Sequence, residues 1–429
     1  MSALSMIRSL NRTQRNTFLA SFLGWTLDAF DYFVVSFVVI HIAKDFKVTV
    51  PAVALAITVT LMMRPLGALI FGLLADRFGR RVPLMIDIIF YSLIELLTAF
   101  SPNFTIFFIL RALYGIGMGG EWGVGASLAL EALPTESRGL FSGILQQGYA
   151  VGYLIAAVIF ALIYPAFGWR AMFIIGALPA LLVLYIRGSV PESEVWKQHR
   201  EARSGRNVTF WRDLGIAIKQ HWVIFIYAVI LMSAFNYMSH GTQDLYPTFL
   251  EAQRKLSTGT VATIAIIYNI GAICGGTLFG YFSQRWGRRR TIIIAAVLGL
   301  VVVPLWVFSP SLVLLTIGAF LLQFMVQGAW GVIPVHLNEL SPPSARGTFP
   351  GFTYQLGNLI SANAAFLEAQ FALNFKDASG HPNYAITLAV LAAIVFVAVI
   401  ILTAIGREAK GIEFTPELIT PDTRQEAIS

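Results

Sequence analysis

Twelve long apolar segments determine what this chain can fold into. About 20 consecutive apolar residues span a bilayer as an α-helix, and the sequence reaches roughly this length twelve times. Segments 1 to 12 cover residues 18–42, 52–75, 83–101, 104–128, 140–164, 168–188, 221–250, 260–283, 291–309, 311–336, 347–373 and 382–405. Only 12% of the residues are charged, whereas soluble domains carry about 25%. We therefore predict an all-α membrane protein with twelve transmembrane helices.

Basic residues gather on one side of the predicted bundle. If the N-terminus is cytoplasmic, the cytoplasmic stretches hold 22 of the 30 Lys and Arg residues and the outer loops hold six. Those six are Lys44, Lys47, Arg170, Arg254, Lys255 and Lys376. This asymmetry follows the positive-inside rule. We therefore predict cytoplasmic termini in the plasma membrane (the inner membrane of a bacterium), and we assign the net charge of +7 to topology and not to nucleic-acid binding.

A repeat with an offset of 208 residues divides the chain. The sequence GLLADRFGRR recurs as GYFSQRWGRR, and a glutamate seven residues before an Arg-Gly pair also recurs. The repeated pairs are residues 72–81 with 280–289, Glu131 with Glu339, and Arg138 with Arg346. One constant offset indicates two pseudo-symmetric six-helix bundles, an arrangement found in many transporters. The predicted domains are the N-terminal bundle 1–188, the cytoplasmic linker 189–220 and the C-terminal bundle 221–429.

The repeated loop resembles the Gly-x-x-x-Asp-Arg-x-Gly-Arg-Arg signature of the major facilitator superfamily, whose members have this twelve-helix layout. The resemblance implies a gate in which Asp76 and nearby charges latch the cytoplasmic helix ends together in the outward-open state. The gating residues expected are Asp76, Arg80, Glu131, Arg138, Glu339 and Arg346. Gln284 replaces Asp76 in the second copy, which predicts a weaker second latch. The alternative is that these loops anchor the topology without gating.

Segment 7 carries polar and ionisable side chains at membrane depth. Asn236, His240 and Asp244 follow one another at four-residue spacing, so they share one face of a helix. Such residues inside a membrane mark substrate, ion or proton paths by default. The 208-residue offset relates Asp28 to Asn236 and Tyr32 to His240. We therefore expect segments 1 and 7 to turn polar faces towards one central cavity.

The same stretch resembles one group within the superfamily. Residues 236–248 read NYMSHGTQDLYPT, which is similar to the segment-7 signature of the fungal lactate and pyruvate permeases. That group belongs to the sialate:proton symporter branch of the superfamily, and residues 24–31 and 138–149 are similar to it as well. The resemblance implies uptake of a small monocarboxylate with a proton. A larger acid such as sialic acid, for which the branch is named, is the alternative.

A carboxylate substrate needs a fixed cation and hydrogen-bond donors. Arg64 in segment 2 has the planar fork that binds carboxylates in bidentate fashion, although pairing with Asp28 or Asp31 is an alternative. Asn236 would donate an amide hydrogen to the substrate, or else bridge helices. The permeases carry a similar Gln-x-x-Asn pair in segment 11, which implies a second substrate-facing surface unless these amides bridge segments 10 and 11. The substrate-binding residues expected are Arg64, Asn236, His240, Gln355 and Asn358.

Proton coupling needs a group that titrates near neutral pH. Histidine has the only side chain whose unperturbed pKa falls near 6.5, and His240 has Asp244 one turn away to help it hold a proton. A neutral histidine used for helix packing is the alternative. Asp28 and Asp31 cannot both stay ionised without partners in a low dielectric. One of these two aspartates is therefore a second candidate proton carrier.

Segment 4 adds one basic and one acidic candidate. Arg111 begins a sequence that resembles the Arg-x-x-x-Gly-x-Gly motif of proton-coupled members of the superfamily. Glu121 departs from the lactate permeases and resembles broader metabolite:proton symporters, or it forms a buried ion pair with Arg64 or Arg111. Glu95 and Glu368 have no basic partner within their own helices and say little. The proton-coupling residues expected are His240, Asp244, Asp28, Asp31, Glu121 and Arg111.

Motifs of other functional classes are missing from the sequence. There is no Gly-x-x-x-x-Gly-Lys-[Ser/Thr] loop for ATP, no nucleophile–base pair and no metal-ligand cluster, so we expect no enzyme, cofactor or metal. Segment 5 lacks the Gly-Pro motif of the superfamily's drug antiporters, which favours uptake, and the short tail after residue 406 disfavours a nutrient sensor. The partners expected are the lipid bilayer, a proton and a small organic anion, with a monomer as the functional unit.

Overall fold

The structure is a computed structural model that describes residues 3–204, 210–375 and 383–414. The regular elements in these residues are all helices. The N-half contains α1 (Ala3–Ser9), α2 (Arg12–Asp45), α3 (Val50–Phe78), α4 (Arg81–Ala99), α5 (Phe104–Ala132), α6 (Arg138–Gln146), α7 (Gly148–Ile175) and α8 (Ala180–Ser189). Helix α9 (Glu194–Ser204) follows. The C-half contains α10 (Phe210–Gln243), α11 (Tyr246–Thr248), the π-helix η1 (Phe249–Gln253), α12 (Thr258–Trp286), α13 (Arg288–Phe308), α14 (Leu312–Trp330), α15 (Ile333–Leu340), the 3-10 helix η2 (Pro343–Ala345), α16 (Phe349–Ser361), α17 (Ala364–Asn374) and α18 (Tyr384–Ile405).

The predicted membrane segments correspond to these helices. Ten helical stretches in the described residues are long and apolar enough to cross a membrane. One of them, Arg138–Ser189, has 52 residues and bends at Gly168, so it covers predicted segments 5 and 6. Segment 11 is the pair α16 and α17, which is interrupted before Ala364. An all-helical, multi-pass fold is confirmed, while the count of twelve spans stays a prediction.

The predicted linker 189–220 is itself largely helical where the structure describes it. It contains α9 and the first turns of α10. Helix α10 kinks at His221, whose backbone leaves the helical region with φ −114° and ψ 16°. This kink falls where segment 7 was expected to begin. The domain boundaries themselves stay predictions.

The 208-residue repeat appears in the ends of equivalent helices. Gly79 and Gly287 end α3 and α12 with φ values of 101° and 93°, a region that favours glycine because a Cβ would be strained there. Thr49 and Ser257 begin the same two helices, each accepting a hydrogen bond from a backbone N–H three residues on. Such side-chain caps satisfy N–H groups that a helix start leaves without a partner.

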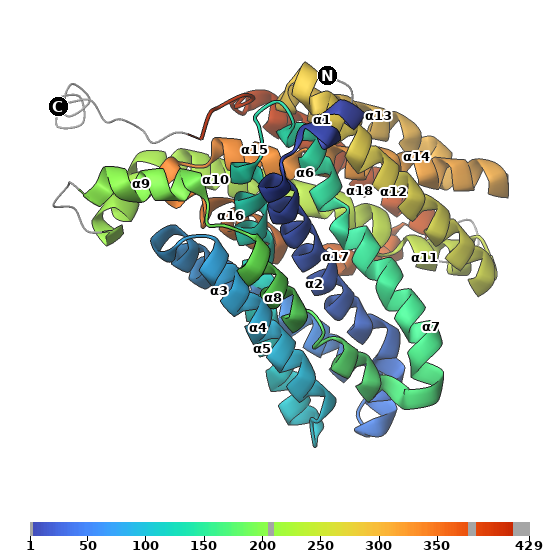
Figure 1. Cartoon of the computed structure of the whole chain (residues 1–429). Helices are drawn as coiled ribbons and strands as arrows, with labels where there is room; N and C mark the ends of the chain where they lie inside the picture. The colour runs from blue at the N-terminus through green and yellow to red at the C-terminus, as the bar shows by residue number, and fades with distance from the viewer. Residues whose placement is uncertain (1–2, 205–209, 376–382, 415–429) are drawn as a thin grey trace.

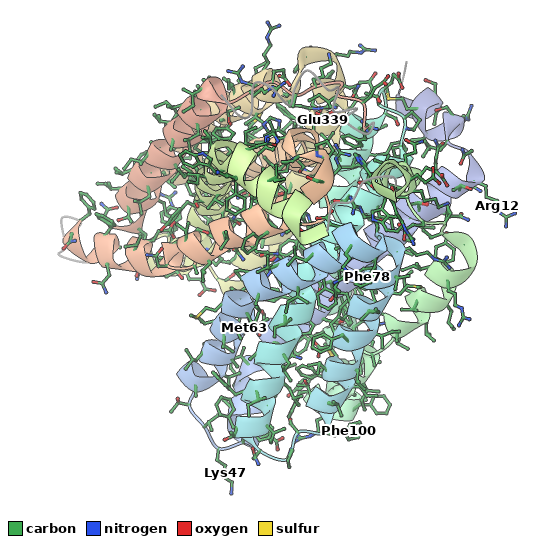
Figure 2. The ribbon with its side chains drawn as sticks, turned by 90° about the vertical axis from the view of Figure 1, so that its left-hand side faces the viewer. Arg12, Lys47, Met63, Phe78, Phe100 and Glu339 are labelled. Atoms are coloured by element: carbon green, nitrogen blue, oxygen red, sulfur yellow. The ribbon has the colours of Figure 1, made fainter. Side chains whose placement is uncertain are left out.

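The two halves meet near the predicted cytoplasmic end and diverge away from it (Figure 1). Helix α6 packs on α12, and α16 packs on α3 and α5. Glycines let the backbones touch at these contacts. A Cβ on Gly143 would lie 2.4 Å from the Gly276 carbonyl oxygen, and one on Gly123 would lie 2.6 Å from the Gly351 Cα. Figure 2 shows Lys47 and Phe100 at the opposite end of the molecule from Glu339.

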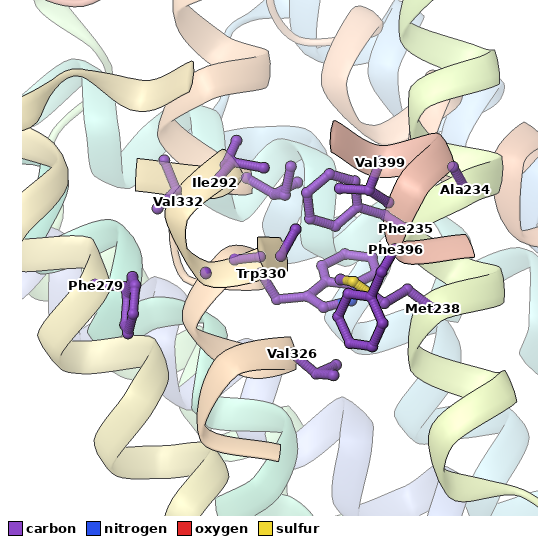
Figure 3. Close-up of a cluster of buried hydrophobic side chains, with 14 of the residues drawn as sticks. Ala234, Phe235, Met238, Phe279, Ile292, Val326, Trp330, Val332, Phe396 and Val399 are labelled. Atoms are coloured by element: carbon purple, nitrogen blue, oxygen red, sulfur yellow. The ribbon is translucent and has the colours of Figure 1, made fainter. Parts of the chain in front are cut away.

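Apolar side chains hold each half together. In the C-half, Phe235 of α10 packs edge-on against Trp330 of α14, with ring centroids 5.5 Å apart. Phe396 of α18 and Ile292 of α13 belong to the same buried cluster (Figure 3). Aromatic pairs of this kind contribute about 0.5–1.5 kcal/mol beyond the burial of their area. The core therefore positions α10 and α16, which carry the polar residues described next.

Candidate functional site

Arg64 is a buried cation without an ion partner. It lies on α3 with 3% of its surface exposed, and its Nε and Nη2 atoms form no hydrogen bond. Asp28 is within electrostatic range, but no acidic group in the described part of the chain lies within ion-pair distance of Arg64. The predicted alternative of an ion pair with Asp28 or Asp31 is therefore not found. The guanidinium keeps donors available for an anion.

An aromatic ring lies beside the same guanidinium. The Arg64 Cζ atom lies 5.6 Å from the centroid of the Tyr354 ring on α16. Tyr354 in turn contacts Trp122 at 4.7 Å and Trp330 at 5.6 Å between centroids. These two tryptophans are 208 residues apart, so each half supplies the equivalent ring. Tyr149 of α7 also lies within electrostatic range of Arg64. The cation thus sits where the two halves face each other.

His240, near the end of α10, and Asp244, directly after that helix, are brought together as predicted. The His240 Nδ1 atom lies 3.2 Å from the Asp244 Oδ2 atom, and the two side chains are 33% and 36% exposed. Asn358 of α16 also interacts with His240. Neither side chain is therefore fully enclosed by the protein.

The rest of the segment-7 stripe is used for packing. Thr242 and Gln243 turn towards α14, where each interacts with Gln323. Asn236 donates its amide hydrogen to the carbonyl of Met232, one turn back on its own helix, at 2.8 Å. Neither of the two uses expected for the Asn236 amide hydrogen, substrate binding or an interhelical bond, is made in this state.

Gln355 and Asn358 share a buried face of α16. Both polar atoms of the Gln355 side chain lack a hydrogen-bond partner, although only 1% of the residue is exposed. A buried amide without partners costs about 1–3 kcal/mol, which makes it a candidate for a bond to a ligand or water. The predicted alternative, a bridge between segments 10 and 11, is not found for Gln355.

Carboxylates without partners lie behind the site in the N-half. Asp31 and Glu121 are buried, and none of their carboxylate oxygens forms a hydrogen bond. Two glycines leave room for these carboxylates. A Cβ on Gly24 would lie 2.3 Å from a Glu121 oxygen, and a Cβ on Gly176 would lie 2.7 Å from an Asp31 oxygen. Asp28 accepts a hydrogen bond from Tyr114 at 3.3 Å. The alternative ion pair of Glu121 with Arg64 or Arg111 is not found.

The partner of Arg111 is an acid that sequence reasoning set aside. Arg111 of α5 and Glu95 of α4 form a buried ion pair at 3.0 Å, with each side chain 1% exposed. The interpretation of Glu95 as an acid of little information was wrong, because its partner lies on the neighbouring antiparallel helix. The signal was available, since both residues lie near the short connection between Ala99 and Phe104.

Two further acids are buried, of which sequence reasoning missed Asp87 and set Glu368 aside. Asp87 of α4 and Glu368 of α17 are nearly inaccessible, and their carboxylate oxygens lack hydrogen bonds. Asp87 lies within electrostatic range of Glu121, and Glu368 within range of His240. Five charged positions of the N-half have no charged counterpart in the C-half. The positions 208 residues after Arg64, Asp87, Glu95, Arg111 and Glu121 hold Ala272, Ala295, Val303, Ala319 and Ala329.

Each half carries the same charged clasp at the predicted cytoplasmic end. The Arg80 Nη2 atom lies 3.0 Å from Glu131, and the equivalent Arg288 Nη2 atom lies 2.9 Å from Glu339. Glu192 accepts hydrogen bonds from the backbone N–H groups at the start of α4. Glu408 does the same at the start of α13. These bonds suit helix starts, where N–H groups favour a negative charge.

The two copies of the loop reach across to the opposite half. Asp76 accepts hydrogen bonds from the Gly347 N–H at 2.7 Å, from the Thr348 N–H at 3.0 Å and from the Thr348 hydroxyl at 2.7 Å. Gln284 accepts one from the Gly139 N–H at 3.2 Å. The halves are therefore joined at this end by two symmetry-related contacts, and the one with the carboxylate has more bonds.

Arg138 and Arg346 contact a residue that the sequence did not single out. Both guanidinium groups stack on the ring of Phe414, at 3.7 and 4.1 Å from its centroid. Arg138 also donates a hydrogen bond to the Ile412 carbonyl at 3.0 Å. The chain after α18 therefore joins one arginine from each half.

Comparisons with known proteins agree with this architecture. The profile of the Major Facilitator Superfamily matches residues 21–365 and, in a second match, residues 234–421. The chain is 31% identical over 436 residues to a carboxylic acid transporter protein homolog of Saccharomyces cerevisiae, covering 94% of this chain and 69% of that protein. It is 30% identical over 358 residues to the sialic acid transporter NanX of Escherichia coli, covering 83% of this chain and 86% of that protein.

Among solved structures, the proton:xylose symporter XylE has a similar fold. The TM-score is 0.75 at 18% identity, and the match covers 94% of this chain and 98% of that one. At this identity the similarity concerns the fold alone. Together with the family match and the relatives above, it identifies the chain as a multi-pass membrane transporter, not an enzyme, that belongs to the Major Facilitator Superfamily.

Proposed function

We propose that this transporter imports small monocarboxylates of the lactate and pyruvate type together with protons, by alternating access. The observation that carries the proposal is Arg64, a buried guanidinium whose donors have no acidic partner. A buried charge is costly unless it is paired, and a carboxylate is the partner whose geometry a guanidinium matches. The 31% identical yeast relative named as a carboxylic acid transporter supports the same class of substrate.

The proton and the anion have separate places in this proposal. The anion binds Arg64, and the free amide of Gln355, Asn358 and Asn236 orient it. The proton binds the His240–Asp244 pair, while Asp28, Asp31 and Glu121 are the alternative carriers, with Arg111 holding Glu95 beside them. The loaded site is close to neutral, so moving it through low-dielectric surroundings costs less than moving the anion alone. If a second proton moves, a potential of 100 mV adds about 2.3 kcal/mol per charge.

Gating in this proposal uses the charged loops. The clasps Arg80–Glu131 and Arg288–Glu339 keep each half rigid, and Asp76 joins the halves at the predicted cytoplasmic end while the opposite end is open. Arg138 and Arg346 follow the movement through their shared contact with Phe414. Transport then requires that the bonds of Asp76 break and form again in each cycle.

A larger organic acid is the second candidate substrate. The relative NanX is named as a sialic acid transporter, and Arg64 lies beside the ring of Tyr354, which the two symmetry-related tryptophans flank. Rings of this kind stack on cyclic substrates. Lactate and pyruvate have no ring, so only a larger, cyclic acid would use this arrangement for stacking.

Uptake of labelled lactate, pyruvate and sialate into proteoliposomes tests the proposal. With the outside acidic and the inside neutral, we expect accumulation of a monocarboxylate above equilibrium, and collapse of that gradient by a protonophore. Competition by unlabelled sialate distinguishes the two candidate substrates. If an acidic exterior drives none of the three acids, the proposed symport is wrong.

His240→Ala should separate accumulation from exchange. Without the imidazole the site loses the side chain proposed to carry the proton, so uphill uptake driven by the pH gradient should fall at least about tenfold. Exchange of internal for external substrate requires no net proton movement, so counterflow should persist. Full accumulation by this variant would return His240 to a packing role.

A further inference from the structure

A pocket of about 580 Å³ lies at the outer end of the N-half, and Arg64 is not among the residues that line it. It is formed where α2 ends and where α7 breaks at Gly168. Figure 2 shows Lys47 at this end of the molecule. The lining residues used below are His41, Lys44, Asp45, Lys47, Tyr164 and Arg170.

The pocket carries an excess of positive charge. Three of the six basic residues predicted on the outer side, Lys44, Lys47 and Arg170, line it. Its one acid, Asp45, pairs with Arg170, which leaves both lysines without an acidic partner in the described part of the chain. A concave site of one sign concentrates ions of the opposite sign and raises their rate of association.

The pocket is preformed by the backbone around it. Lys47 has a left-handed φ of 54°, and Gly168 has a φ of 71°. The turn at Gly168 brings Trp169 back to α2, where its indole N–H donates to Asp45 at 3.2 Å. The Arg170 guanidinium stacks on Trp169, 4.2 Å from the ring centroid. These bonds fix the walls before any ligand arrives.

A row of aromatic rings connects the pocket to the central site. Consecutive rings along α2 and α7 lie 4.2 to 5.5 Å apart between centroids. The row runs through His41, Tyr164, Phe160, Phe37, Tyr153, Phe33 and Tyr149. All seven side chains are partly exposed. The last ring, Tyr149, lies within electrostatic range of Arg64.

We infer that this pocket is an outer binding site for the organic anion, where a carboxylate is captured before it moves along the aromatic row to Arg64. The inference rests on the proposed function, because it concerns the same substrate. Lys44 and Lys47 attract the carboxylate, and the rings bind the apolar part of an acid by stacking. The ligand class is a carboxylate with a planar or ring-bearing body. Continuity with the aromatic row favours a soluble acid over a lipid phosphate.

The repeat supplies a matched control. Lys255 lies 208 residues after Lys47, is also exposed, and has nearly the same left-handed backbone with a φ of 56°. It is not part of the pocket. Lys47→Gln and Lys255→Gln therefore remove the same charge from equivalent turns, and only the first removes it from the proposed site.

Initial rates of benzoate and pyruvate uptake into phosphatidylcholine liposomes test the site. In low salt, Lys47→Gln should raise KM about three- to tenfold with unchanged Vmax, since the charge acts on association. The difference should shrink at about 0.5 M salt, and Lys255→Gln should stay within about twofold of the parent. Equal KM values for the two variants would overturn the outer site. A rise in KM that Lys47→Gln shows only in liposomes with anionic lipids would also overturn it, because the pocket would then bind a lipid headgroup.

A binding measurement separates failure of this site from failure of the proposed function. The Arg64→Gln variant lacks the central cation. In this variant, fluorescence energy transfer from Trp169 to added 2-naphthoate should still be seen and should saturate with ligand concentration. That component is identified by its loss in Trp169→Phe, and Lys47→Gln should raise the 2-naphthoate concentration at half-saturation about three- to tenfold. If the parent transports no acid but this signal is present, the proposed function fails and the site stands. If the signal is absent, the site is wrong whatever the transport result.

Discussion

Arg64→Gln should abolish accumulation of the organic acid and its exchange. The guanidinium is buried, and its Nε and Nη2 atoms form no hydrogen bond within the protein, so both can bind the substrate. Each charge-assisted hydrogen bond to a carboxylate contributes about 1.5–3 kcal/mol. Losing a bidentate pair should therefore weaken binding at least about 100-fold. Arg64→Lys keeps the charge but loses the planar fork, so it should give an intermediate loss.

Counterflow and equilibrium binding measure this effect without a proton gradient. Both should be lost in Arg64→Gln, whereas His240→Ala should lose only accumulation. Arg64→Gln should still fold, because Arg64 has no ion partner that the substitution would leave buried and unpaired. A circular-dichroism melt within a few degrees of the parent checks this point. Binding within about threefold of the parent would assign Arg64 a structural role.

Asp76→Ala should shift the transporter away from the state described here, towards one that is open at the predicted cytoplasmic end. Asp76 accepts three hydrogen bonds from the C-half at 2.7 to 3.0 Å. At about 1–2 kcal/mol for each bond, their loss changes the equilibrium more than about 100-fold. Gln284→Ala removes the symmetry-related contact, which consists of one accepted bond and one donated to the Thr135 carbonyl. Its shift should be clearly smaller.

Spin labels across the opposite end of the molecule measure the shift. Phe100 and Val313 are exposed at 68% and 66%, and each lies at the outer end of a different half. Cys274, the only cysteine of the chain, is first replaced by serine. The distance between the labels should shorten in Asp76→Ala and change less in Gln284→Ala. Equal distributions in parent and both variants would show that these loops anchor topology without gating.

The repeat predicted the clasp residues well, because a constant offset gives both the residue type and its position along the equivalent helix. Arg80 and Glu131 are matched by Arg288 and Glu339, and both pairs form. Glu192 and Glu408 play equivalent parts but are 216 residues apart, so the constant offset of 208 could not reveal them. Insertions between the repeats hide equivalence from the sequence even where the geometry keeps it.

Side-chain direction around a helix was predictable only in part. Four-residue spacing placed His240 and Asp244 on one face, as the structure has them. The same spacing does not say where the face ends, and Thr242 and Gln243 turned out to pack against Gln323. Partners on other helices, such as Glu95 for Arg111, depend on packing that no spacing within one helix encodes.

The glycine contacts between the halves have a mechanical consequence. Where Gly143 meets Gly276 and Gly123 meets Gly351, backbone lies against backbone. Two such surfaces can slide past each other without any rotamer change, so their contacts add little to the energy barrier for this movement. The activation barrier of the rocking motion then comes mainly from rupture of the polar bonds between the halves. Asp76 and Gln284 make some of these bonds, and Ser127 and Ser142 make others. Substitutions at these polar positions should therefore change turnover, while the glycine contacts let the halves move past each other.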